Sequence, residues 1–113
     1  MNAPKQQADW ANFLKYYSEA NKDRLTRIGV FETFSDVTDD FWIEDGLPLC
    51  GIDLEIRKDT PVIEIILKGY THVVRGVRTI RPTYSLDGSE DGLDLIGPGE
   101  TTTTLRFEGG PRT

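Results

Sequence analysis

The sequence predicts an α+β fold, in which an N-terminal helix packs on an antiparallel meander sheet of about six to eight short strands. Apolar residues near the N-terminus are spaced as on one face of a helix, and apolar and polar residues alternate through most of the remaining chain. The turn segments between these runs are too short for the crossovers that parallel strands need. Residues 1–108 are therefore predicted to form a single domain, with 109–113 as a flexible C-terminal tail.

The helix is predicted over about residues 9–20. Trp10, Phe13, Leu14 and Tyr17 recur at intervals of three and four residues, so that they share one face. Asp9 precedes this stripe at the position of a helix N-cap. Such an aromatic stripe is typical of a face that packs against a core.

The strands are predicted from alternation and from the residues that interrupt it. The first covers 25–34, and a polar turn over 35–40, a short strand over 41–43 and a second turn over 44–46 follow. The clearest alternation begins at Cys50 and places it with Ile52 and Leu54 on a buried face. Further strands are expected over 62–68, 72–75, 77–84, 93–96 and 101–107, with a bulge or bend at Gly76.

Composition excludes several classes of protein. The chain has 113 residues, 13 basic and 19 acidic side chains, a net charge of -6, one His and one Cys. It has no apolar run long enough to span a membrane and no apolar leader near residue 1, so a cytoplasmic protein is expected. A single cysteine forms no internal disulfide, and the net negative charge disfavours nucleic-acid binding.

The charge is segregated along the chain. Residues 32–64 carry ten acidic and two basic side chains, whereas 65–86 carry four basic and no acidic ones. His72, Arg75, Arg78 and Arg81 lie in this basic stretch and are the candidate binding residues for a partner's carboxylates, an anion or RNA. In the alternative interpretation, these arginines pair across strands with Asp53, Glu55 or Glu64.

No complete catalytic or metal-binding motif is present. An enzyme would use His72 as a general base beside Asp53, Glu55 or Glu64. A dyad of Cys50 and His72 would need an exposed thiol, which the predicted burial of Cys50 opposes. The stretch from Asp87 to Gly92 resembles the start of a calcium loop but lacks the Glu required at position twelve. We therefore predict no metal and no cofactor.

Three stretches carry a family resemblance. They are Leu-Pro-Leu-x-Gly-Ile over 47–52, Glu-Ile-x-Leu-x-Gly over 64–69, and a His-x-x-Arg-x-x-Arg-x-Ile pattern over 72–80. With these motifs the chain resembles a small family of uncharacterised bacterial proteins, a domain of unknown function. Val77 stands where that family tends to have Pro. The resemblance implies a bacterial, cytosolic, single-domain α+β protein and includes His72, Arg75 and Arg78 in the shared pattern.

The sequence favours a non-enzymatic interaction or regulatory module that binds a protein partner or itself. The binding surface would be an exposed sheet edge or the surface from His72 to Arg81. The alternatives are an enzyme acting on a small molecule or nucleotide with His72 as general base, and a module that binds RNA or an anion through Arg75, Arg78 and Arg81.

Overall fold

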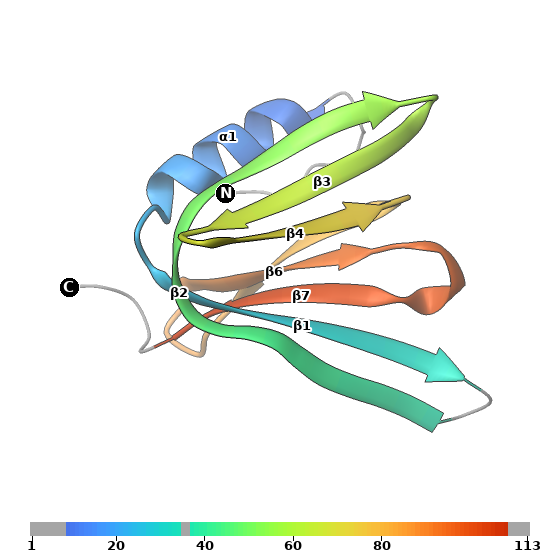
Figure 1. Cartoon of the computed structure of the whole chain (residues 1–113). Helices are drawn as coiled ribbons and strands as arrows, with labels where there is room; N and C mark the ends of the chain where they lie inside the picture. Colours follow the sequence, from blue (N-terminus) through green and yellow to red (C-terminus); the bar gives the residue numbers. More distant parts are fainter. Residues whose placement is uncertain (1–8, 35–36, 109–113) are drawn as a thin grey trace.

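One helix packs on a seven-stranded antiparallel sheet in the computed structural model, which describes residues 9–34 and 37–108 (Figure 1). The predicted α+β class is confirmed, and the predicted tail over 109–113 lies outside the described residues. The elements in chain order are α1 (Trp10–Ala20), β1 (Leu25–Phe34), β2 (Val37–Arg57), β3 (Thr60–Leu67), β4 (Tyr70–Arg75), β5 (Thr79–Tyr84), β6 (Glu90–Ile96), the 3-10 helix η2 (Pro98–Glu100) and β7 (Thr102–Phe107).

The long strand β2 joins the two halves of the sheet. The strand order is β4-β3-β2-β1-β7-β6-β5, and β2 pairs with β1 through its first half and with β3 through its second. Figure 1 shows the sheet curving sharply along β2. The predicted turn over 44–46 is wrong, because β2 absorbs Gly46 (φ +79°) as an irregularity in the β1 pairing and continues. The predicted turn over 35–40 is also too long, since Val37 already pairs with Phe34.

An irregularity in the pairing of β2 with β3 reverses the expected placement of Cys50. Leu49 pairs with Leu67 and Gly51 with Ile66, so that Cys50 is an extra residue between two regular pairs. Leu49 is buried on one side of this bulge, and Cys50 is exposed. The prediction that Cys50 lies on the apolar face is therefore wrong, because simple alternation fails at a bulge.

The helix ties the two halves of the sheet together. Tyr17 is 0% exposed, its hydroxyl donates to the Gly92 carbonyl of β6 at 2.7 Å, and its ring stacks on Phe107 of β7. On the β2 side, the Ile52 N–H donates to the Ser18 hydroxyl oxygen at 2.9 Å. The aromatic stripe of α1 is thus part of the core, as predicted. Asp9 occupies the N-cap position, but its side chain makes no capping hydrogen bond.

No helix within residues 9–34 and 37–108 has the length and apolar character required to cross a membrane.

Candidate functional site

The four predicted binding residues lie on the two edge strands of the sheet and in the connection between these strands. His72 and Arg75 belong to β4, Arg78 lies in the connection after it, and Arg81 belongs to β5. Because β4 and β5 are the two ends of the strand order, this short stretch contains both edge strands. Arg75, Arg78 and Arg81 are exposed, whereas His72 is half-buried.

His72 faces the core side of the sheet. On β4 the more buried side chains are Tyr70, His72 and Val74, and the exposed ones are Thr71, Val73 and Arg75. The His72 ring lies nearly parallel to that of Tyr70, with 6.5 Å between centroids. Burial lowers the pKa of the imidazole below its ordinary value, which favours the neutral form near pH 7.

The carboxylates of the alternative catalytic arrangement face the opposite side. His72 pairs with Ile65 on β3, and Glu64, the neighbour of Ile65, points the other way because side chains alternate along a strand. Asp53 pairs with Glu64 and shares its outer face, as does Glu55 two residues further along β2. The register therefore does not bring His72 together with Asp53, Glu55 or Glu64.

Arg57 pairs with two of these carboxylates, those of Glu55 and Glu64. Its guanidinium lies 2.7 Å from Glu55 and 3.5 Å from Glu64. The hydrogen bond from Arg57 lowers the pKa of Glu55. The expectation that Arg75, Arg78 or Arg81 pairs with Asp53, Glu55 or Glu64 finds no support among the described residues.

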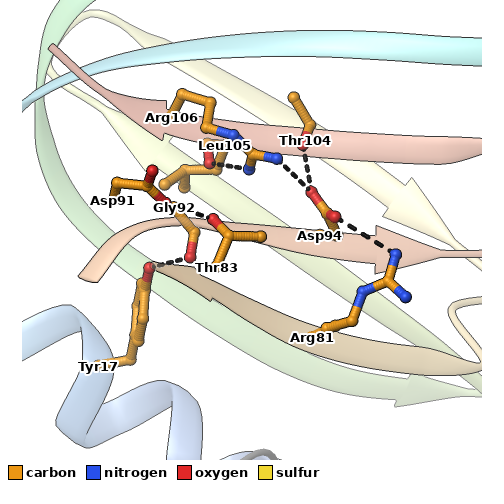
Figure 2. Close-up of polar contacts among 9 residues, drawn as sticks. All are labelled: Tyr17, Arg81, Thr83, Asp91, Gly92, Asp94, Thr104, Leu105 and Arg106. Atoms are coloured by element: carbon orange, nitrogen blue, oxygen red, sulfur yellow. Dashed lines mark hydrogen bonds and ion pairs between the residues drawn. The ribbon is translucent and has the colours of Figure 1, made fainter. Parts of the chain in front are cut away.

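Arg81 instead belongs to a network around Asp94 that the sequence reasoning missed (Figure 2). Asp94 of β6 is only 8% exposed, and its carboxylate lies 3.6 Å from the Arg81 guanidinium and 3.0 Å from that of Arg106. The Thr104 hydroxyl donates to the same carboxylate. Arg81, Asp94 and Thr104 form one row across β5, β6 and β7. The acidic residue between Leu93 and Leu95 was a signal for this network in the sequence. Its partners, however, depend on how β6 pairs with β5 and β7.

Arg75 and Arg78 have no such partner in the described part of the chain. Arg75 stands opposite an apolar residue, Val62, and is exposed. Neither arginine makes an ion pair with another described side chain. These two guanidinium groups are therefore available for external anionic groups.

A groove between α1 and β2 contains the exposed cysteine. Its volume is about 430 Å³, and Lys15, Ser18, Cys50 and Asp53 are among its lining residues. The Ser18 hydroxyl is already engaged, because it donates to the Leu14 carbonyl at 2.6 Å and accepts from Ile52. His72 does not line this groove, so the groove does not bring Cys50 together with the imidazole.

The calcium-loop resemblance corresponds to a hairpin between β5 and β6. The Asp87 carboxylate accepts hydrogen bonds from the Ser85 and Ser89 hydroxyls and from the Ser89 N–H, which lower its pKa to about 2. Asp91 accepts a 2.6 Å hydrogen bond from the Thr83 hydroxyl. These carboxylates stabilise the hairpin. Among the residues that the structure describes, no three His, Cys, Asp or Glu side chains are arranged to hold a metal ion.

Comparisons with protein-family models, curated proteins and solved structures find no match to this chain. The resemblance to an uncharacterised bacterial family thus stays a prediction.

The open edge of β4 is the most distinctive feature of the region. The Gly76 N–H donates to the Pro61 carbonyl of β3 at 2.9 Å, and hydrogen-bonded pairs alternate along antiparallel strands. Val74, His72 and Tyr70 therefore direct their backbone groups toward β3. Thr71 and Val73 direct their N–H and C=O groups away from β3, to the side of β4 on which no strand within residues 9–34 and 37–108 pairs with it.

The two edges of the sheet differ. Strand β5 contains Pro82, which has no N–H to offer to a further strand. Proline and charged side chains are common means of blocking an edge. In β4, neither occurs before Arg75 at its end, and Val73 is 36% exposed. Near that end, the Gly97 and Pro98 turn approaches Gly76, so the open stretch is centred on Thr71 and Val73.

Proposed function

We propose that this protein is a non-enzymatic interaction module that binds a protein partner by accepting an extended segment of that partner beside β4. The observation that carries the proposal is the outward direction of the Thr71 and Val73 backbone groups at a sheet edge that no other described strand pairs with. Added strands of this kind gain affinity from main-chain hydrogen bonds and specificity from alternate side chains.

The dimensions of β4 suit a short peptide. Six residues at about 3.3 Å each give an edge of about 20 Å, which accommodates a partner segment of about five residues. An added strand would form its hydrogen-bonded pairs opposite Thr71 and Val73, because both residues direct their backbone groups to the open side. Arg75 has the same backbone direction, but the turn at Gly97 approaches its carbonyl group. The exposed Val73 side chain offers apolar contact to the same segment.

The test substitution is Val73→Pro, with Val73→Ala as the matched control. Proline removes the outward N–H and places its ring at the open edge, but it breaks no hydrogen bond to β3, because the Val73 and Glu64 pair is not a hydrogen-bonded one. Alanine shortens the side chain to a methyl group and keeps the N–H. A display library of random peptides of about twelve residues, selected on the wild-type protein, supplies the binding probes.

Selected peptides are expected to shift the amide NMR signals of Thr71 and Val73. Loss of a hydrogen bond together with the steric block should weaken binding to the Val73→Pro variant at least about tenfold in calorimetry. The Val73→Ala variant should retain affinity within about threefold, because the backbone donor remains. Peptides that bind equally well to Val73→Pro, or that shift only signals remote from β4, would contradict the proposal. A library that yields no binder would also contradict it.

A further inference from the structure

We infer that the segment captured by β4 is acidic, with a carboxylate opposite Arg75, a second within reach of Arg78, and an apolar side chain opposite Val73. This inference rests on the proposed strand addition and adds the chemical class of the partner.

The charge distribution points to an acidic partner. The whole chain has a net charge of -6, yet residues 65–86, which contain β4 and β5, carry four basic side chains and no acidic one. Lys68 precedes β4 in its turn with β3, and Arg75 ends the strand. An extended segment beside β4 therefore meets a cation at each end of the edge. Complementary charge of this kind directs association and selects the partner.

Arg75 and Arg78 are the arginines nearest the open edge, and neither forms an ion pair with a described side chain. Arg57 pairs with Glu55 and Glu64, and Arg81 and Arg106 pair with Asp94. Within 9–34 and 37–108, no such ion pair engages Arg75 or Arg78. The side chain of Arg75 lies on the outer face of β4, with Thr71 and Val73. A carboxylate on an added strand opposite Arg75 would thus complete an ion pair that the fold leaves open.

The partner residue opposite Val73 is expected to be apolar, unlike the acidic residue opposite Arg75. On its other side Val73 pairs with Glu64 of β3, whose carboxylate is only partly neutralised by Arg57 at 3.5 Å. A second carboxylate two strands away from Glu64, at about 10 Å, would be repelled, whereas an apolar side chain would cover the exposed Val73. Val73 and Arg75 are two residues apart on one face. The expected partner pattern is therefore one apolar and one acidic residue separated by a single residue.

Two synthetic peptides test this inference. Both are about ten residues long and alternate Thr and Val, and they differ only in two positions, which are Glu in the acidic peptide and Lys in the basic one. Binding is followed by amide NMR titration of the labelled protein. The variants are Arg75→Glu and, as a charge-matched control, Lys22→Glu in the exposed turn between α1 and β1.

The acidic peptide should shift the Thr71 and Val73 signals and bind at least about fivefold more tightly than the basic peptide. Arg75→Glu should weaken the acidic peptide about five- to tenfold and strengthen the basic one, and Arg78→Glu should act in the same direction. Lys22→Glu should leave both affinities within about twofold. Raising the salt from about 50 to about 500 mM should weaken only the acidic peptide.

The titrations distinguish failure of the acidic-partner inference from failure of the proposed strand addition. If both peptides shift the β4 signals with equal affinity, strand addition stands and the inference of an acidic partner is wrong. If neither peptide shifts these signals, the inference and the proposed function are both contradicted. If Arg75 and Arg78 instead bind RNA, a short oligo-uridine should bind to them. If it binds more tightly than the acidic peptide without shifting Thr71 and Val73, the basic residues are a nucleic-acid surface and the inference is wrong.

Discussion

Removing the Tyr17 hydroxyl by Tyr17→Phe should destabilise the protein measurably, because this group joins α1 to β6. The hydroxyl is fully buried and donates to the Gly92 carbonyl at 2.7 Å. Phenylalanine preserves the ring contact with Phe107, so that the substitution removes the hydrogen bond and little else.

The magnitude follows from the burial of both partners. A net hydrogen bond contributes about 1 kcal/mol, and leaving a buried carbonyl without its donor adds to the loss, so we expect a decrease of about 1.5 kcal/mol in the free energy of unfolding. For a domain of this length, the unfolding entropy is about 0.24 kcal/mol/K, and the expected decrease in Tm is about 6 °C.

Urea denaturation followed by tryptophan fluorescence measures this difference. Tyr16→Phe is the matched control, because Tyr16 precedes Tyr17 on the same helix and is 58% exposed. The control should change the free energy of unfolding by less than about 0.5 kcal/mol. Equal stability of Tyr17→Phe and the control variant would refute the assignment of this hydrogen bond as a tie between helix and sheet.

Alkaline pH provides a second test of the same group. Burial and, to a smaller extent, the charge of Glu90 raise the pKa of Tyr17 well above its ordinary value of 10.0. Folding therefore favours the protonated phenol, and this contribution is complete below pH 10 and lost as the pH rises above 10. The Tyr17→Phe variant does not have this loss. The stability difference between the two proteins should shrink by about 1.4 kcal/mol per pH unit above pH 10.

Two further predictions concern the sheet and its histidine. Gly92→Ala would place a Cβ atom 2.1 Å from the backbone carbonyl oxygen of Leu105, so it should lower the free energy of unfolding by about 3 kcal/mol in urea denaturation. Gly51→Ala should cost far less, because no residue beyond its chain neighbours lies within 4 Å of the added Cβ atom. Because burial lowers the pKa of His72, folding favours neutral imidazole, and stability should fall as the pH drops below 6.5. A His72→Gln variant with an unchanged acid dependence in thermal denaturation would contradict this.

The sequence by itself determined the fold class and several elements. The three-and-four spacing of the aromatic residues on α1 reports a helix face directly, because all its members are neighbours along one chain segment. The strand expected over 25–34 is β1 with the same bounds. Alternation likewise separated Arg75 from the buried Val74. Periodicity of this kind is a local property, so it can be read without knowledge of the partner strands.

Pairing was decided only by the tertiary structure. One extra residue in β2 exposes Cys50, and a period of two cannot show where such a bulge falls. Composition likewise does not show that Arg57 pairs with Glu55 and Glu64. Nor does it show that Asp94 pairs with Arg81 and Arg106, because ion pairs between strands depend on strand order and register.

The open edge of β4 is also decided by the tertiary structure. The sequence predicts a strand over 72–75, whereas β4 begins at Tyr70 and so includes Thr71. Whether a strand lies inside a sheet or at its end depends on where every other strand pairs. The direction of the Thr71 and Val73 backbone groups depends in turn on the hydrogen bond from Gly76 to Pro61, which sets the alternation along β4. Local sequence therefore specified the strand and its charges, and long-range pairing determined which of its groups remain available to a partner.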